Sequence, residues 1–360
     1  MTAKSSHALY KLMYSFVRVL PWSSLFVPRP PSVINGQTPP ALPPHRLQLS
    51  ANTTQRANPR RQRAMAAAAV AEIPLIDLAG NEIDVSRKLV AAAEDHGFIY
   101  IRNVGADITP ASVDEAFSLS KMLFESPVEE KQKCSIQQNN RGWSSMHSET
   151  LDPKHQRVGD FFSRVHPVAI DSSSSGSVLR FLRYPAPESV SHDADDVRAG
   201  AHSDYGSITL LFRLKGQAGL EILKKDNSWA PVPVCPPGTD KDPSPPILVN
   251  IGDLLSYWTN GLFRSTVHRV VFPTAGEKVA VGESNSGPRY SIAYFCHPVG
   301  SARLEPVPSE RVKNYIPVDD TPDVNPYAER KVMTADAHLL MRLKESYGTL
   351  YDDKQEESSQ

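Results

Sequence analysis

Cysteine is scarce in this sequence of 360 residues, and the few cysteines form no motif. Cys134, Cys235 and Cys296 are an odd number, lie far apart and include no Cys-x-x-Cys pair. A disulfide framework uses paired cysteines, and a cysteine zinc site uses closely spaced ones. The pattern therefore argues against both kinds of site and favours a reducing compartment.

Long apolar runs are missing as well. The longest apolar segment, Leu9 to Val27, is interrupted by Lys11, Arg18 and Pro21. A helix that spans a bilayer needs about 20 largely apolar residues. We therefore expect no membrane-spanning segment and no membrane partner.

Acidic residues are absent from the first 71 positions. That segment holds nine Lys and Arg residues, whereas the remainder holds 30 basic against 40 acidic residues and carries a net charge of −10. A body that acidic offers no electrostatic footprint for nucleic acid. The sequence therefore predicts no nucleic-acid partner.

The basic, Ser- and Pro-rich stretch of residues 1–71 is interpreted as a disordered extension of the fold. Ala8 to Leu20 can be drawn as an amphipathic helix, which together with the lack of acidic residues is typical of a mitochondrial presequence. Met65, directly before the first structured segment, is an alternative start. We expect an extension or a later start, and hence a cytoplasmic protein, with a mitochondrial one as the alternative if residues 1–64 form a presequence.

Two short strands and two helices are expected before the β-rich part of the chain. The strands are 73–78 and 98–101, and the first helix is Asp84–His96, with Gly97 as the residue that ends it. The second helix begins at the N-cap Thr109 and runs to about Glu125. The side chains that we expect it to turn toward the core are Val113, Ala116, Phe117 and Met122.

From Val178 the hydrophobic period becomes two. The expected strands are 178–184, 207–212, 220–223, 229–232, 247–251, 266–272 and 290–295. Short strands separated by frequent turn signals predict a mainly β protein, built as an antiparallel sandwich or barrel. A last helix is expected from the N-cap Thr334 to about Tyr347, with Leu339, Leu340, Met341 and Leu343 as its apolar stripe.

His202 and Asp204 stand directly before one of these strands. In extended backbone, residues i and i+2 point the same way, so this imidazole and this carboxylate can aim at one point. Two polar residues on the exposed face of a strand would look the same. The pair by itself therefore does not distinguish a site from a surface.

Two later segments add to this pair. His268 lies inside the β-branched run Ser265–Phe272, and Arg289 and Ser291 share a strand face on which they can jointly hold a carboxylate. Two imidazoles and one carboxylate form the facial triad that suits non-haem Fe(II). Such a triad leaves three positions of an octahedron for a bidentate cosubstrate and dioxygen.

Between about Ile73 and Tyr347 a series of short motifs follows one another along the chain. They are, in order, Ile73-Pro-Leu-Ile-Asp77, His96-Gly-Phe98, Pro127-Val-Glu-Glu-Lys131, Arg141-Gly-Trp143, His202-Ser-Asp204-Tyr-Gly-Ser207, Gly219-Leu-Glu-Ile222, Val249-Asn-Ile-Gly-Asp253, His268-Arg269 and Arg289-Tyr-Ser291. With these motifs the sequence resembles the iron(II)- and 2-oxoglutarate-dependent dioxygenases of the isopenicillin N synthase-like branch, and it looks closest to uncharacterised fungal and microbial members.

The resemblance implies a double-stranded β-helix, or jelly roll, with flanking helices. The dioxygenase would then consist of an N-terminal α/β region (72–178), a jelly-roll core (179–300) and a C-terminal helical segment with a tail (301–360). It also implies cofactors and products. Fe(II), 2-oxoglutarate and O2 would oxidise a small organic molecule by hydroxylation, desaturation or ring closure, with succinate and CO2 as co-products.

The resemblance also implies residue roles. His202, Asp204 and His268 would be the catalytic iron ligands. Arg289 and Ser291 would bind the distal carboxylate of 2-oxoglutarate, and Tyr184 would assist them. The turn at Asn250–Asp253 is expected to serve structure, with Asp253 bonding nearby amides, and neither His96 nor His297 is given a ligand role.

The sequence departs from the family after Gly159-Asp160. In related chains a substrate-facing loop and a long helix follow, but here residues 161–176 lead to Val178 almost at once. Without that helix the barrel would expose apolar surface, so a monomer with a tendency to self-associate is expected. Two alternatives remain: an iron oxidase whose Arg-x-Ser pair holds the substrate's own carboxylate, and a non-catalytic scaffold.

Overall fold

The computed structural model describes residues 70–103, 108–137, 142–145, 159–163, 176–186, 197–272, 287–307, 309–315 and 332–347, with the backbone alone for 159–163. The chain divides into two units, of which Ser23–Ala68 lies wholly outside the described residues. The expectations for residues 1–69 of the basic extension, for residues 164–175 of the shortened segment and for the tail beyond 347 also lie outside them, whereas Ala71, the last residue of the extension, is buried and its amide donates to the carbonyl oxygen of Pro231.

Helix α2 (Glu82–Asp95) begins two residues earlier than expected because the side chain of Asn81 caps it, accepting from the amides of Ile83 and Asp84. Its end is as predicted, with His96 as the C-cap. Gly97 follows with a φ of +67°, a left-handed conformation that favours glycine, and a Cβ at this position would collide with the carbonyl oxygen of Arg264. His96 is therefore a residue of the helix end, as expected.

Helix α3 (Pro110–Glu125) confirms the predicted boundaries. The hydroxyl of Thr109 accepts from the amide of Ser112 at 3.1 Å, and Pro110 opens the first turn. The prediction that Met122 faces the core is wrong, since its side chain is 66% exposed. Met122 lies five residues after the buried Phe117, which places it about 140° around the helix.

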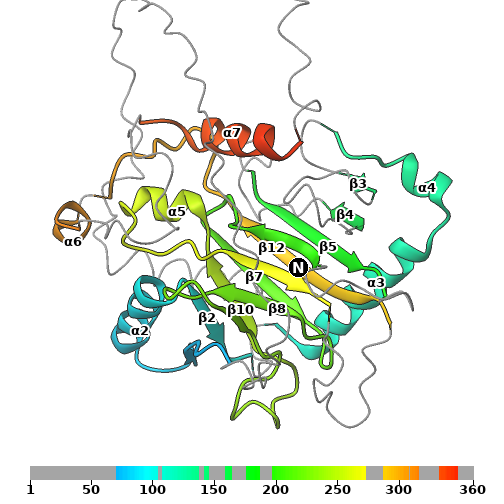
Figure 1. The fold of residues 1–360 in the computed structure, drawn as a ribbon, viewed down its shortest axis with the longest axis horizontal. Coiled ribbons are helices and arrows are strands. Elements are labelled where there is room, and N and C mark those ends of the chain that lie inside the picture. Colours follow the sequence, from blue (N-terminus) through cyan, green and yellow to red (C-terminus); the bar gives the residue numbers. More distant parts are fainter. Residues whose placement is uncertain are drawn as a thin grey trace, which may run out of the picture. The chain divides into compact units, whose positions relative to one another are not determined.

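The strands form two sheets (Figure 1). The eight-stranded sheet has the order β1 (Leu75–Ile76), β2 (Phe98–Ile101), β10 (Ile247–Ile251), β7 (Ile208–Arg213), β12 (Arg289–Cys296), β5 (Val178–Tyr184), β4 (Gly159–Ser163) and β3 (Trp143–Ser144). The four-stranded sheet has the order β6 (Val197–His202), β11 (His268–Val271), β8 (Leu220–Leu223) and β9 (Trp229–Pro231).

Neighbouring strands pair antiparallel throughout both sheets except for the parallel pair β1–β2. Buried apolar residues from both sheets pack against one another, among them Leu182, Leu248 and Ala293 from one and Ile222 and Val270 from the other. Two largely antiparallel sheets around one core match the predicted antiparallel sandwich or barrel, and they are the jelly roll that the family resemblance implies. Strands β3, β4 and β6 are additions to the prediction.

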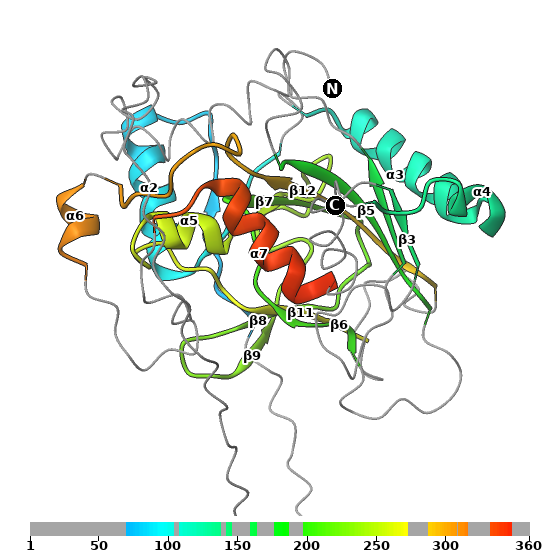
Figure 2. The ribbon, with the colours of Figure 1, turned by 90° about the horizontal axis from the view of Figure 1, so that it is seen from above.

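Helices cover the outer face of the larger sheet (Figure 2). At one end, α2 packs with the short helices α5 (Asp253–Trp258) and α6 (Glu310–Lys313) in one buried cluster. At the other end, α3 packs against β5 and β12, and the short helix α4 (Val128–Gln132) follows it. The larger sheet is thus buried on both faces along much of its width.

Helix α7 (Ala335–Tyr347) lies across one end of the two sheets in both views (Figures 1 and 2). The hydroxyl of Thr334 accepts from the amide of Ala337 at 3.2 Å, which confirms the predicted cap. Leu343 is buried as expected, whereas Leu340 is exposed, and His338 is fully buried in its place. The buried face of α7 is therefore more polar than its leucines suggested.

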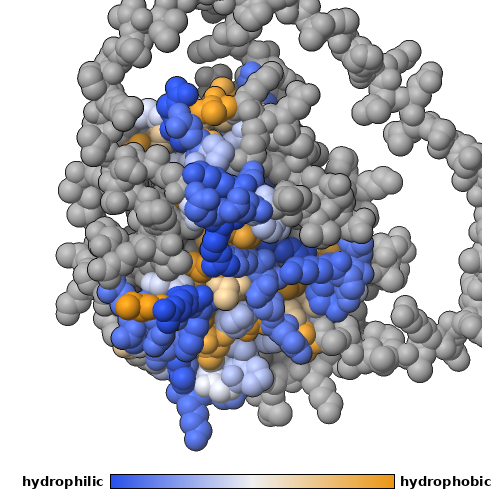
Figure 3. All heavy atoms as spheres, turned by 90° about the vertical axis from the view of Figure 1, so that its left-hand side faces the viewer, coloured by the Kyte–Doolittle hydropathy of each residue, from blue (hydrophilic) through white to orange (hydrophobic). Residues whose placement is uncertain are grey.

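The face that carries α2 and α6 is largely hydrophilic, with apolar atoms in separate spots (Figure 3). Elsewhere, Leu119 and Met122 of α3 and Val128 of α4 are exposed. Within the described ranges no helix is long and apolar enough to cross a membrane. The expected tendency to self-associate stays a prediction.

Candidate metal centre

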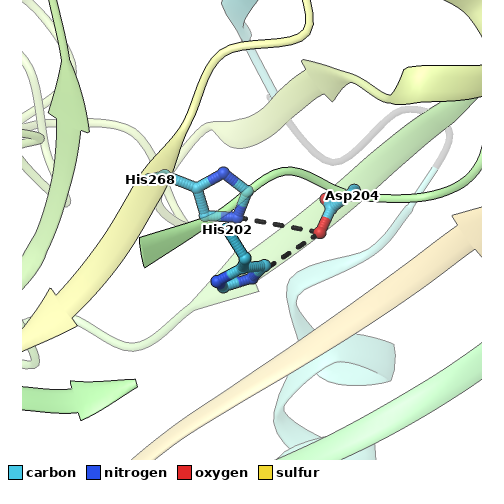
Figure 4. Close-up of side chains that lie close together, drawn as sticks. All are labelled: His202, Asp204 and His268. Atoms are coloured by element: carbon cyan, nitrogen blue, oxygen red, sulfur yellow. Dashed lines mark ion pairs between the residues drawn. The ribbon is translucent and has the colours of Figure 1, made fainter. Parts of the chain in front are cut away.

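The structure brings His202, Asp204 and His268 together (Figure 4). His202 ends β6 and His268 begins β11, and the two lie directly opposite each other in the ladder between these strands. Asp204 follows two residues after His202, and its Oδ1 lies 3.9 Å from Nε2 of His202 and 3.7 Å from Nε2 of His268. One ligand atom from each residue lies within 4.8 Å of the other two.

Both imidazoles present Nε2 to this point because Nδ1 is held by the backbone. Nδ1 of His202 lies 2.8 Å from the carbonyl oxygen of Gly200, and Nδ1 of His268 lies 3.1 Å from that of Thr266. A carbonyl oxygen only accepts, so each Nδ1 donates its proton there. In the neutral form of each ring the lone pair is then on Nε2, the arrangement in which histidine binds a metal.

Asp204 is held by its other oxygen. Oδ2 accepts from the hydroxyl of Thr209 and from the side-chain amide of Asn250, both at 2.6 Å. Burial raises the pKa of Asp204, but the nearby His268 and His202 and these two hydrogen bonds outweigh it, so the pKa is lowered overall. The carboxylate is therefore ionised, with Oδ1 left to face the histidines.

Two neutral imidazoles and one ionised carboxylate are a donor set that fits a divalent iron ion. The residues that orient the carboxylate were missed in the sequence, where Asn250 was assigned to a structural turn. Asn250 lies in the buried strand β10, inside the strand predicted over 247–251, and its side-chain amide donates to Asp204. A polar residue inside an apolar strand was the signal that could have found it, because a buried amide needs a partner.

Asp253, the first residue of α5, ties the two halves of the centre together. Its carboxylate accepts from the hydroxyl of Ser203 at 3.0 Å and from that of Ser265 at 2.7 Å. Asp253 was expected to bond amides, and this was wrong because the turns that carry the ligands bring serine hydroxyls to it. Its own amide donates to the carbonyl oxygen of Asp204 at 2.7 Å.

The preceding Gly252 is required by close packing. A Cβ at this position would collide with the carbonyl oxygen of Gly206, in the turn that follows Asp204. The amides of Gly252 and Leu254 donate to the carbonyl oxygens of Ser207 and Gly206. The start of α5 therefore satisfies its free N–H groups on the turn that carries Asp204.

The predicted carboxylate-binding residues lie between the two sheets. Arg289 and Ser291 alternate along β12 with Tyr290 and Ile292, which pack outward against α3. Tyr184 lies opposite Arg289 in the ladder between β5 and β12, and the guanidinium carbon of Arg289 is 5.0 Å from the centre of its ring. The structure thus groups all three residues on the inner side of the larger sheet.

Family models and relatives agree with this geometry. A model of the N-terminal domain of non-haem dioxygenases of morphine synthesis matches residues 73–182, and a model of the 2OG-Fe(II) oxygenase superfamily, where 2OG is 2-oxoglutarate, matches residues 175–298. A UPF0676 protein of Schizosaccharomyces pombe is 33% identical over 303 residues, which cover 67% of this chain and 86% of the relative. The chain belongs to the 2OG-Fe(II) oxygenase superfamily.

Other relatives place the oxygenase among enzymes that use 2-oxoglutarate. The 2-oxoglutarate-dependent dioxygenase caaD of Aspergillus niger is 25% identical over 281 residues, covering 58% of this chain and 83% of the relative. The structure of Neurospora crassa T7H in complex with alpha-KG and thymine is 26% identical, with a TM-score of 0.58 over 77% of this chain and 99% of that one. The predicted family, jelly-roll fold and enzyme class are confirmed.

Proposed function

We propose that His202, Asp204 and His268 hold the Fe(II) of the oxygenase. The observation that carries the proposal is the convergence of one ligand atom from each residue to within 4.8 Å, while the remaining ring nitrogens and Oδ2 are held elsewhere. This arrangement leaves one ligand atom per residue facing a common point. Proteins fix metal ligands in this way through their hydrogen-bonded neighbours.

We further propose that Arg289 and Ser291 bind the distal carboxylate of 2-oxoglutarate beside Tyr184. Nη1 of Arg289 and the hydroxyl of Ser291 are buried, and neither has a hydrogen-bond partner in the described part of the chain. Nε of Arg289 donates to the carbonyl oxygens of Gln217 and Ala218, at 3.2 and 3.0 Å, so the fork is fixed in direction. A guanidinium held this way suits a carboxylate.

Bound Fe(II) supplies the activation of O2 that couples the conversion of 2-oxoglutarate into succinate and CO2 to oxidation of a C–H bond. The protein residues bind and orient. Asp204 and the two histidines would hold the metal, and Arg289 and Ser291 would orient the cosubstrate. The buried apolar residues of both sheets exclude water from the space around them.

The substrate is a small organic molecule on this proposal. Two relatives support this. A dioxygenase of Streptomyces hygroscopicus subsp. limoneus is named for validamycin A, and the structure of Neurospora crassa T7H is a complex with thymine. Fold does not select among such substrates. The substrate of this oxygenase is therefore to be found by screening.

The test is the formation of succinate from 2-oxoglutarate under air by the Fe(II)-loaded protein, with and without a panel of small organic molecules. We expect slow turnover alone and faster turnover with a true substrate. The variant His202→Ala should form no succinate, with or without a substrate. The control variant His96→Ala, at the end of α2, should form it at the rates of the wild type. An enzyme that oxidises a substrate without forming succinate would instead be an iron oxidase that does not consume 2-oxoglutarate.

A further inference from the structure

A second arginine lies inside the fold, beyond the residues that the family motifs identify. Arg198 is in β6, four residues before His202, and only 3% of its surface is exposed. The ladder between β6 and β11 is irregular here: Val270 pairs with Ala199, but the next residue pairs with Val197. An irregularity of this kind re-aims a side chain out of the regular alternation.

The guanidinium of Arg198 lies against an aromatic ring, with its central carbon 4.9 Å from the centre of Phe272. Nε and Nη2 are buried, and within the described part of the chain no hydrogen bond reaches either of them. A buried cation is rarely left without hydrogen-bond partners, because losing its hydration costs several kcal/mol. Nε and Nη2 of Arg198 are therefore expected to bind a hydrogen-bond acceptor of a ligand.

The charged and polar groups that act on Arg198 are Arg289 and Tyr184, two of the residues proposed to bind the cosubstrate. Burial, followed by the positive charge of Arg289, lowers the pKa of Arg198 to about 10, while Tyr184 acts in the opposite direction. None of the groups that act on Arg198 in the described structure is a carboxylate.

The backbone places the two arginines near each other as well. Nε of Arg289 donates to the carbonyl oxygens of Gln217 and Ala218, and the carbonyl oxygen of the next residue, Gly219, accepts from the amide of Val271 at 2.8 Å. Val271 pairs with Val197, the neighbour of Arg198, so the two buried guanidinium groups repel each other.

A third buried arginine shows how such a group is satisfied without a ligand. Arg213 in β7 also acts on Arg289, but its own terminal nitrogens donate to the carbonyl oxygens of Val232 and Val234, at 3.3 and 3.4 Å. Its guanidinium also lies over the ring of Tyr100. Both terminal nitrogens of Arg213 therefore have partners, whereas Nη2 of Arg198 has none in the described structure; Nε lacks a partner in both arginines.

We propose that Arg198 is a second guanidinium for the distal carboxylate of 2-oxoglutarate, which it shares with Arg289 from the opposite sheet. A carboxylate has about four lone-pair sites, enough to accept from two guanidinium groups and from Ser291 together. The bound anion also removes the repulsion between the two arginines. This role rests on the proposed function and makes Arg198 a determinant of cosubstrate specificity.

The test is equilibrium binding of 2-oxoglutarate and of 2-oxopentanoate to the Mn(II)-loaded full chain, by calorimetry without oxygen. 2-Oxopentanoate has the same length but ends in a methyl group, so it lacks the distal carboxylate. In Arg198→Met, which keeps an apolar stem against Phe272, the Kd of 2-oxoglutarate should rise about ten- to a hundred-fold. The Kd of 2-oxopentanoate should stay unchanged.

Two further variants keep the result interpretable. Arg198→Lys retains the charge without the planar fork and should fall between the wild type and Arg198→Met. Arg102→Gln removes an arginine that pairs with Asp242 at 2.7 Å, outside the pocket, and should leave both Kd values unchanged. Without ligand, Arg198→Met should melt no lower than the wild type, because it removes a buried repulsion.

Two outcomes would overturn the proposal: an unchanged Kd for 2-oxoglutarate in folded Arg198→Met or Arg198→Lys, or an equal loss for both ligands. An unchanged Kd for 2-oxoglutarate with a raised KM for the organic substrate would assign Arg198 to that substrate instead. Failure of the wild type to bind 2-oxoglutarate at all would contradict the proposed function, which is a different result from either of these.

Discussion

The guanidinium of Arg342 in α7 lies 3.0 Å from the carboxylate of Asp253 in α5. The same guanidinium stacks over the ring of Tyr205, one residue after Asp204, and the hydroxyl of Tyr205 contacts that of Ser346. The C-terminal helix therefore holds the turn that carries Asp204 at two places. Asp253 in turn accepts hydrogen bonds from Ser203, between His202 and Asp204, and from Ser265, three residues before His268.

Removal of the Arg342 guanidinium should destabilise the fold. In Arg342→Met the Asp253 carboxylate, whose side chain is 18% exposed, would lose its ion pair. Breaking a buried pair from one side costs about 3 kcal/mol in the free energy of unfolding. Urea unfolding at pH 7.5 measures this loss, and a loss below about 1 kcal/mol would contradict the structural role given to the pair.

The pH dependence of that loss provides a second check. Burial raises the pKa of Asp253, and the charge of Arg342 opposes this, so the variant should raise the pKa further. A carboxyl group whose pKa is higher in the folded than in the unfolded state destabilises the protein at a pH above its folded-state pKa. It has no such effect at a pH below its unfolded-state pKa. The difference between the variant and the wild type should therefore shrink as the pH falls from 7.5 toward 4.

An exposed ion pair serves as the control for Arg342. Arg303 and Glu305 lie 2.9 Å apart, but their side chains are 67% and 52% exposed. Exposed pairs contribute about 0–1 kcal/mol. Arg303→Met should therefore change the free energy of unfolding by less than about 1 kcal/mol at every pH in the same series.

The hydrogen bonds to Oδ2 of Asp204 should set the affinity for metal. Asn250→Ala and Thr209→Val each remove one of two bonds of 2.6 Å. Loss of a residue that orients a metal ligand costs about 10- to 100-fold in metal affinity. Titration with Mn(II) measures it, and Thr239→Val is the control, because Thr239 is equally buried but bonds the carbonyl oxygen of Pro236.

Buried histidines should make the protein sensitive to acid. Burial lowers the pKa of His338 to about 4. Burial, with a smaller contribution from the nearby His338, also lowers the pKa of His297 to about 4. When a histidine has a lower pKa in the folded state than in the unfolded state, the protein loses stability as the pH falls from the unfolded-state pKa toward the folded-state pKa. Between pH 7 and 5 each should cost about 2 kcal/mol in the free energy of unfolding.

The variant His338→Leu separates this effect from general acid unfolding. The free energy of unfolding should fall less steeply between pH 7 and 5 in the variant than in the wild type, by about 2 kcal/mol. Equal slopes for the two proteins would show that His338 does not remain neutral in the folded state.

Much of the site was predictable from local backbone geometry. Alternation along a strand indicated that His202 and Asp204 point one way and that Arg289 and Ser291 share a face, and the structure has both pairs in those positions. The place of Arg198 in the fold was not predicted, because the irregular ladder at Ala199 has no signature in the sequence. Local rules hold where the backbone is regular.

The contacts between distant segments were not predictable. Arg342 and Asp253 are far apart in sequence, and nothing in either segment indicates that α7 lies across the end of the sheets. Met122 shows that prediction also fails within a single helix. The boundaries of α3 could be predicted from local signals, but not which of its apolar residues face the sheet. Both are decided by packing partners that are remote in the chain.

The most direct test of the account is anaerobic titration of the full chain with Fe(II) and then 2-oxoglutarate. The wild type and His96→Ala should develop a weak visible charge-transfer band. His268→Ala should not develop it, because one of three ligands is lost. A band of equal strength in His268→Ala and His96→Ala would contradict the assignment of His202, Asp204 and His268 as the iron site.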